Sequence, residues 1–447
     1  MKRYIIVVAM AMTAMNLPAQ DFDTEPSVTI ENEKKEMKFT VGARFMADAA
    51  LYHTEFTPLQ SGATISDARI RTSMQYKDWY FYADFGFGGG KFQQKNIFLE
   101  YTKETTNGDR HIFKGGYYND PAGSMARNTS LGSYHFISRP GVTNALGDGR
   151  ELGITYRFTN DRWMAYQGVF TENEYNTETA GYNGLVVSGR WIYRPVIDDH
   201  QTLHVGLSGR FSHIGGGEVY NNVLRKSLTL SQSLETYVDN DPSFVTATLP
   251  WANNVWSGGV EALYHNKIFF VRGEYLLKYV TKKRDSYSLF IDAQNNIDGW
   301  GSLELWENAN KLKNNTFMGG YVEAGYKIFG HPYTYDKKES LLGGLDGRSL
   351  EIVGRLSYTG LNNRTKGEYF NAGRGQYYSA GHMEDWPGTG ATTVGGGNIL
   401  SATVGINYAF NKFAQVMLDY TYHHLDRDLL PYDKNFHQVQ ARLQFAF

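Results

Sequence analysis

Cationic side chains recur at alternate positions along much of this 447-residue chain, and they are the residues best suited to binding chemistry. Arg69 and Arg71 are two residues apart, so in an extended strand both side chains leave the same face. A guanidinium group presents a fixed fork of donors that matches phosphate and carboxylate. We therefore interpret nine cations as pore-lining, anion-binding residues: Arg44, Arg69, Arg71, Lys114, Arg127, Arg139, Arg157, Arg190 and Arg210.

Acidic residues occur at the same alternate positions, which leaves a second interpretation open. In that interpretation the cations pair with acids across the interior, and their only role is to keep the interior hydrated. The acids on the same predicted face are Asp48, Asp84, Glu100, Glu151, Glu261, Glu274, Glu323, Glu351 and Asp419.

The elements that must position these charges are strands with one apolar and one polar face. In the final stretch, FHQVQARLQFAF, apolar residues such as Val439 and Leu443 alternate with glutamines and Arg442, which is a period of two. No helical period is sustained over several turns. About sixteen runs share the two-residue period: 37–49, 67–76, 79–87, 95–103, 111–118, 149–158, 162–172, 184–195, 201–212, 256–265, 268–281, 317–329, 348–360, 398–410, 413–426 and 436–447.

The connections between these runs alternate between short turns and long loops, the longest being 118–148, 213–255, 282–316 and 361–397. This alternation is typical of outer-membrane barrels, whereas a β-sandwich, the other all-β candidate, does not require it. We therefore predict an all-β fold, a transmembrane antiparallel β-barrel with short periplasmic turns and long extracellular loops. The connection at 330–347 departs from the rule, because it is long but falls on the short side. It indicates a small extra element or a miscounted strand.

The N-terminus has the features of an export signal, because Lys2 and Arg3 precede an apolar run and the small residue Ala19 precedes Gln20. We predict a signal peptide at 1–19, an N-terminal periplasmic lead-in at 20–36 and the barrel at 37–447. The chain has no cysteine, which excludes disulfides and thiolate metal sites. Its net charge of -2 argues against a nucleic-acid partner.

The long connection at 118–148 is the segment best placed to narrow a channel. It contains Arg127 and Arg139, and its only acids are Asp120 and Asp148, so we expect a positive field around it. We predict that it folds inward at the constriction. An ordinary surface loop is the alternative.

Other chemistry finds little support in the sequence. His423 and His424 lie near Asp419, but adjacent residues of a strand face opposite sides, so we expect no metal site and no cofactor. Two further functions stay open beside a channel. One is an outer-membrane hydrolase of the phospholipase type, although the G-x-S-x-G sequence of many serine hydrolases is absent. The other is a structural or adhesin barrel without conductance.

Three segments, ARIRTSMQYKDWYFYADFGF, IFKGGYYNDPAGSMARNTSLGSYHFISRP and GRELGITYRF, resemble the phosphate-selective porin O and P family of Gram-negative outer membranes. The resemblance is a diffuse pattern over nearly the whole mature chain. It implies a sixteen-stranded barrel, usually a homotrimer, with an inward loop at the constriction and an arginine ladder that lines the pore. It assigns comparable roles to Arg69, Arg71 and Arg127. The family also places lysines at the constriction, and 118–148 contains none.

The resemblance further implies that the terminal aromatic residue, Phe447, is read as an assembly signal. Taken together, the sequence predicts a porin of the bacterial outer membrane rather than an enzyme. We expect a water-filled channel for passive diffusion of small solutes, with a preference for phosphate or other anions. The expected partners are such solutes, outer-membrane lipid and lipopolysaccharide, and further copies of the chain in a homotrimer.

Overall fold

The computed structural model describes most of the chain. The described residues are 28–32, 36–88, 92–171, 184–215, 217–220, 223–240, 244–283, 312–364, 369–371, 376–379, 382–383, 393–427 and 433–447. The signal peptide predicted at 1–19 lies outside these ranges.

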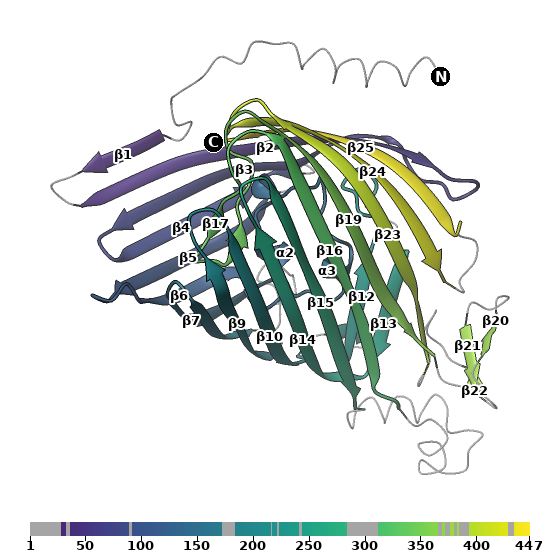
Figure 1. The fold of residues 1–447 in the computed structure, drawn as a ribbon. Helices are drawn as coiled ribbons and strands as arrows, with labels where there is room; N and C mark the ends of the chain where they lie inside the picture. Colours follow the sequence, from purple (N-terminus) through teal and green to yellow (C-terminus); the bar gives the residue numbers. More distant parts are fainter. Residues whose placement is uncertain are drawn as a thin grey trace, which may run out of the picture.

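One large antiparallel sheet closes on itself to form the barrel (Figure 1). The sheet has 17 strands, of which β1 is a short addition and the other sixteen form the wall. Closure is made by β2 (Met37–His53), which pairs with β25 (Asn435–Ala446). Between them the wall runs through β3 (Gly62–Tyr76), β4 (Trp79–Gly86), β5 (Gln93–Glu104), β6 (Arg110–Asn119), β7 (Arg150–Thr159), β8 (Trp163–Thr171), β9 (Leu185–Ile197), β10 (Thr202–His213), β14 (Ala252–His265), β15 (Phe269–Lys282), β16 (Asn315–Phe329), β19 (Ser349–Asn363), β23 (Val394–Ala409) and β24 (Ala414–Asp426).

The two faces of the wall differ as the alternation predicts. Val322 is 55% exposed on the outside, whereas the next residue, Glu323, is 0% exposed on the inside. Trp79 and Trp163 are exposed beside short turns, where amphipathic rings favour a membrane interface. The predictions of an antiparallel barrel and of about sixteen strands are confirmed.

The long connections carry the smaller elements. The loop after β6 contains α2 (Met125–Asn128), η3 (Leu131–Ser133) and α3 (Val142–Ala145). The loop after β10 contains β11 (Gly217–Tyr220), β12 (Val223–Gln232) and β13 (Val245–Pro250), and the loop after β19 contains β20 (Tyr369–Asn371), β21 (Gln376–Ser379) and β22 (His382–Met383). In the part of the chain that the structure describes, no helix is long and apolar enough to cross a bilayer.

Two details differ from the expected outline. The connection that breaks the length rule holds a small hairpin, β17 (Tyr335–Asp336) with β18 (Leu341–Leu342), and this is the extra element that the sequence indicated. In the lead-in, β1 (Val28–Asn32) pairs with the start of β2 over residues 37–41, whereas β25 pairs with β2 from residue 44 onward. A strand was not expected there, because five residues carry little periodic signal.

Candidate functional site

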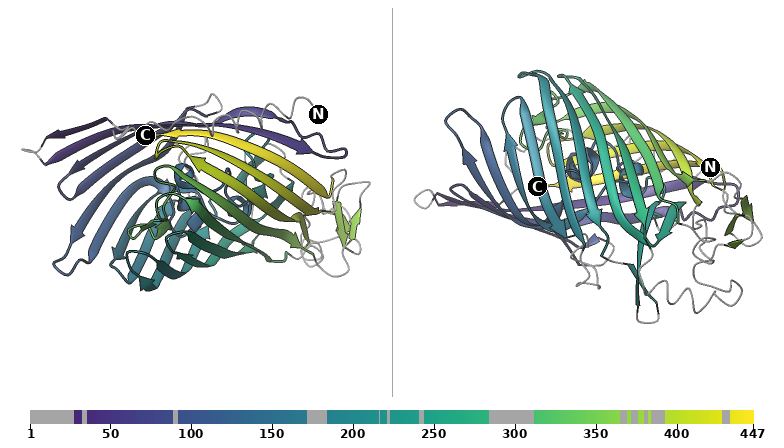
Figure 2. Two further views of the ribbon diagram at one scale, coloured as in Figure 1. Left: turned by 45° about the horizontal axis from the view of Figure 1, so that its top comes forward. Right: turned by 90° about the horizontal axis from the view of Figure 1, so that it is seen from below.

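Among the described residues, three connections turn into the lumen. We name them the constriction loop (120–149), the second inward loop (214–251) and the periplasmic hairpin (330–348). The first two start from the end of the barrel with long loops, and the third starts from the end with short turns. The short helices of the constriction loop lie between the near and far strands of the barrel (Figure 2).

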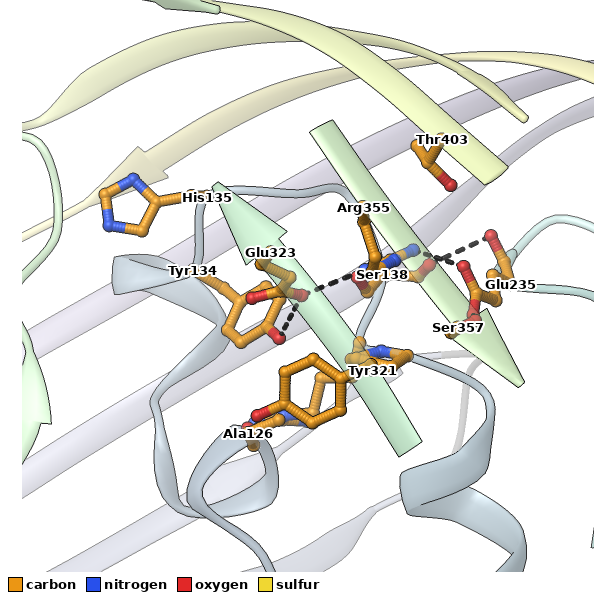
Figure 3. A network of polar contacts seen from close by, with 12 residues as sticks. Ala126, Tyr134, His135, Ser138, Glu235, Tyr321, Glu323, Arg355, Ser357 and Thr403 are labelled. Atoms are coloured by element: carbon orange, nitrogen blue, oxygen red, sulfur yellow. Dashed lines mark hydrogen bonds and ion pairs between the residues drawn. The ribbon is translucent and has the colours of Figure 1, made fainter. Parts of the chain in front are cut away.

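The constriction loop is fixed to the wall opposite its own strands. The carboxylate of Glu274 on β15 accepts the backbone N–H of Met125 at 2.6 Å and the hydroxyl of Ser124 at 2.7 Å. These bonds satisfy donors that the start of α2 would otherwise leave unpaired. Farther along the loop, the Tyr134 hydroxyl donates to Glu323 at 2.7 Å (Figure 3). The loop therefore crosses the lumen, as predicted, instead of extending into solvent.

The second inward loop adds a carboxylate to the same network. Glu235 is paired with Arg355 of β19 and accepts the Ser357 hydroxyl at 2.6 Å (Figure 3). It also accepts the backbone N–H of Gly141 at 2.7 Å, which joins the two loops. Burial alone would raise the pKa of the Glu235 carboxyl, but Arg355 and these hydrogen bonds hold it below its usual value.

The periplasmic hairpin closes part of the lumen from the other end. Its Glu339 carboxylate is 2.6 Å from the Arg157 guanidinium, and its Tyr333 hydroxyl donates to Glu351 at 2.6 Å. His135 of the constriction loop lies 3.0 Å from the carbonyl oxygen of Gly343, so the hairpin meets that loop inside the barrel.

Most inward cations from β9 round to β25 are buried against acids. Arg190 pairs with Glu261 at 2.6 Å, and Arg272 pairs with Glu323 at 2.7 Å. Apolar side chains of the two inward loops fill the space beside these pairs. We call β9, β10, β14–β16, β19 and β23–β25, with the loops packed on them, the packed wall. Further pairs in this wall are Arg442 with Asp48 of the neighbouring β2 at 2.7 Å, Arg210 with Asp148 at 3.2 Å, and Arg355 with Glu235.

The opposite side of the lumen carries a cluster of cations that we call the basic patch: Arg69, Lys95, Arg127, Arg139 and Arg150. The charge of Arg150 lies within electrostatic reach of Arg69 and Arg139, and that of Lys95 within reach of Arg69 and Arg150. Burial lowers the pKa of Arg139, and Arg127 and Arg69 lower it further. Positive charges therefore gather where the constriction loop meets β3, β5 and β7.

The patch has few acids. Arg69 contacts Asp67 at 2.8 Å and Asp84 at 3.0 Å. Among the described residues, no carboxylate lies within salt-bridge distance of the other strand cations of the patch, Lys95 and Arg150, or of Arg139. Their hydrogen bonds go to neutral oxygens: Lys95 to Gln93, Arg150 to Asn96 at 2.9 Å, and Arg139 to the carbonyl oxygens of Ala126 and Thr129, both at 2.7 Å.

A cavity of about 290 Å³ adjoins the patch. Arg127 and Arg150 line it together with Arg210 and Lys278, and the acids in its lining are Asp148 and Glu151. A small anion therefore has both space and an excess of positive charge at this position.

The nine predicted cations fall into three groups. Arg69, Arg127 and Arg139 come together in the basic patch. Arg44, Arg157, Arg190 and Arg210 are held by carboxylates. The remaining two have other partners: Arg71 donates to the main-chain oxygen of Phe447 at 2.9 Å, and the Lys114 ammonium lies 3.7 Å from the centre of the Phe98 ring.

Sequence reasoning missed two members of the patch. Lys95 sits at a β-bulge, where Asp84 pairs with Asn96 and Phe85 with Gln94, so the strict alternation fails at that residue. Arg150 lies in the predicted run 149–158, where alternation puts its neighbour Glu151 on the inward face; it is the first residue of β7. The histidine pair behaves as the alternation predicted: His423 is buried against Ser401, and His424 bonds to Asn435 on the other face.

The comparisons with known proteins agree with this architecture. The family model described as phosphate-selective porin O and P matches residues 39–447. No curated protein matches the sequence.

Solved structures of similar shape are outer-membrane barrels, and at about one-tenth identity the likeness shows the fold alone. OmpT of Vibrio cholerae has 10% identity over 94% of this chain and 100% of its own, with a TM-score of 0.50. An anion-selective porin from Comamonas acidovorans has 9% identity over 92% of this chain and 100% of its own, with a TM-score of 0.50. OprB of Pseudomonas putida has 9% identity over 93% of this chain and 95% of its own, also with a TM-score of 0.50.

Proposed function

The chain belongs to the phosphate-selective porin O and P family, and we propose that this outer-membrane porin conducts anions in preference to cations past the basic patch. As a porin it is a channel of the bacterial outer membrane and not an enzyme. The observation that carries the proposed preference is the gathering of five cations in the patch, of which Lys95, Arg139 and Arg150 hydrogen bond to neutral oxygens within the described residues. The name of one structural neighbour, the anion-selective porin from Comamonas acidovorans, is in keeping with it.

The strength of the anion preference depends on how narrow the solute path is at the basic patch. A unit charge about 4 Å from an anion contributes roughly 1 kcal/mol in water and about 4 kcal/mol at an effective dielectric of 20. Charges at a wide mouth contribute far less, because salt at about 0.1 M screens them beyond about 10 Å. The constriction loop brings Arg139 close to Arg69 on the wall and holds Arg127 beside Arg139, so the patch and not the mouth sets the preference.

The remaining predicted cations have secondary roles in the channel. Arg44 and Arg71 extend the positive field on the β2 and β3 side of the patch. Arg157, Arg190, Arg210 and Lys114 are engaged by acids or rings, so they hold the loops and wall in place more than they bind solute.

The test is the zero-current potential of purified protein in a planar bilayer under a steep KCl gradient. An anion-preferring channel shifts this potential towards the chloride equilibrium potential, and the shift shrinks as salt is raised because screening grows. Repeating the gradient with potassium phosphate shows whether phosphate is preferred over chloride. A shift towards the potassium potential would overturn the proposal.

Assembly is the second part of the proposal. We infer a homotrimer, because the family resemblance implies one and a structure of Vibrio cholerae OmpT is described as a trimer form. Cross-linking of the protein in native membranes should give a trimer band. A monomer as the largest species would contradict it.

We also propose that Phe447 acts in assembly. Its N–H donates to the carbonyl oxygen of Ala43 at 2.8 Å and its oxygen accepts from the N–H of Ala43 at 2.7 Å, so it completes the seam that closes the barrel. Deletion of Phe447 should lower the yield of heat-modifiable barrel. An unchanged yield would remove this role.

A further inference from the structure

The seam that closes the barrel ends in a pair of histidines, at the end of the barrel with long loops. His53 is the last residue of β2 and lies directly opposite His437 of β25. The centres of the two rings are 6.1 Å apart. Directly opposite residues of an antiparallel pair leave the same face of the sheet. The alternation that exposes Leu51 and Val439 on the outside puts both imidazoles there too.

The pair lies at the outer edge of the membrane-facing band. From His437 to Phe447 the strand crosses about 24 Å of membrane, at about 3.4 Å per residue and a tilt of about 45°, which nearly spans the apolar band of such barrels. The outward residues of β24 beside the pair are Tyr420 and Tyr422, whose rings favour the membrane interface. His53 is exposed, so ions of the external medium can reach it.

The hydrogen bonds around the pair leave ring nitrogens available to a ligand. The Tyr420 hydroxyl lies 2.9 Å from Nδ1 of His437 and fixes the orientation of that ring. When Nδ1 donates its proton to the Tyr420 oxygen, Nε2 of His437 carries the lone pair that can bind an ion. No described residue hydrogen bonds to the ring of His53. Metal-binding histidines are commonly oriented in this way, through a hydrogen bond from the second ring nitrogen.

We propose that His53 and His437 together bind one transition-metal dication, such as Zn²⁺, on the outer face of the seam. Imidazole nitrogen is a preferred ligand of Zn²⁺, Cu²⁺ and Ni²⁺, whereas Mg²⁺ and Ca²⁺ take oxygen ligands. Two imidazoles on one tetrahedral ion, with Zn–N bonds of about 2.0–2.1 Å, have ring centres about 5 Å apart. A small rotation of the exposed His53 ring brings the pair to that separation. Among the described residues no group of three or more such ligands comes together, so water fills the other positions of the ion.

An ion at this position joins β2 to β25 across the seam. It binds the closed barrel and not the unfolded chain, so it shifts unfolding to higher temperature. The site is on the outside of the wall, so it does not depend on the proposed anion preference. The expectation of no metal site considered adjacent histidines of one strand, His423 and His424. His53 and His437 come instead from opposite ends of the barrel sequence, where no local motif connects them.

The test is a calorimetric titration of the purified, untagged barrel in detergent with ZnCl₂. We expect one Zn²⁺ per chain in the wild type and loss of this ion in His53→Ala and in His437→Ala. Tyr420→Phe keeps both ligands but loses the hydrogen bond that orients one of them, so binding should weaken by about tenfold. An excess of Mg²⁺ should not displace the ion, because it prefers oxygen. The temperature of the heat-induced mobility shift should be higher in Zn²⁺ than in EDTA for the wild type alone.

The matched control is His111→Gln. His111 is an outward histidine whose Nδ1 lies 2.8 Å from the Tyr156 hydroxyl, which is the same kind of contact that His437 makes. The residues opposite His111 are Lys103 and Phe158, so it has no second imidazole across the sheet. This variant should bind Zn²⁺ as the wild type does.

Two results would overturn the proposal. One is a wild type that binds no Zn²⁺. The other is an ion that both alanine variants retain, because other histidines of the 12 in the chain would then hold it. In EDTA the variants should show the mobility shift of the wild type, which establishes that they fold. Where His437→Ala lowers the yield, His53→Ala alone decides, because His53 is exposed and has no described hydrogen bond to lose.

Discussion

The packed wall and the basic patch both present cations to the lumen, yet they carry charge in different ways. Arg272 and Arg355 in the packed wall face buried acids, Glu323 and Glu235, and the inward loops cover them. Arg150 in the basic patch faces Asn96 and other cations. The comparison shows that the groups placed beside an inward arginine by the loops decide whether it supports stability or conduction. The strand that carries the arginine does not decide this.

The largest effect should come from breaking a pair in the packed wall. Arg355→Ala leaves Glu235 and Glu323 without a cation in a buried site, so we expect a loss of about 3–5 kcal/mol in unfolding free energy. The measurement is the midpoint of urea unfolding in detergent, with the heat-induced mobility shift on gels as a second readout. An unchanged midpoint would mean that the packed wall does not hold the loops.

A smaller effect is expected at the periplasmic hairpin. Glu339→Gln removes the charge that pairs with Arg157, but the Glu339 side chain is 34% exposed, so water screens the pair. We expect a loss of roughly 1 kcal/mol in unfolding free energy and a larger single-channel conductance as the hairpin loosens. Lys337→Gln is the control, because its partner Asp161 is 76% exposed and the pair should contribute nothing measurable. Equal conductance in all three proteins would show that the hairpin does not limit the path.

The smallest change in stability should come from the basic patch, and its sign should be reversed. Arg150→Gln removes one of several mutually repelling charges and leaves no acid unpaired. The unfolding midpoint should stay within about 0.5 kcal/mol of the wild type or rise slightly. A loss comparable to that of Arg355→Ala would show that the patch is a structural network like the packed wall.

Much of the fold could be predicted because its signal is local. A two-residue period is visible in each strand, and the lengths of the connections give the two ends of the barrel. The long connection on the short side was visible as an anomaly, but its inward course was not, because that depends on Arg157 and Glu351 from distant strands.

The partners of the cations could not be predicted for the same reason. Arg190 and Glu261 are 71 residues apart, and Arg355 and Glu235 are 120 apart. Alternation placed Arg190 and Glu261 on the lumen face but said nothing about their pairing, and it said nothing about Glu235, which lies in the long connection 213–255. The sequence did not predict that Lys95 faces the lumen, because the β-bulge at this residue interrupts the two-residue period from which side-chain directions were assigned.

The most direct test of the account compares zero-current potentials of three proteins in the same KCl gradient at about 0.1 M salt. One is the wild type, one is Lys95→Gln/Arg150→Gln in the basic patch, and one is Lys77→Gln/Lys412→Gln, which removes the same charge from exposed turns between strands. At about 6 Å in water each patch charge favours an anion by roughly 0.7 kcal/mol and disfavours a cation by the same amount, which is about tenfold in the anion-to-cation ratio. The account predicts that the patch variant, which lacks two such charges, loses up to about a hundredfold of this ratio while the turn variant matches the wild type. Equal potentials in the patch variant and the wild type would contradict it.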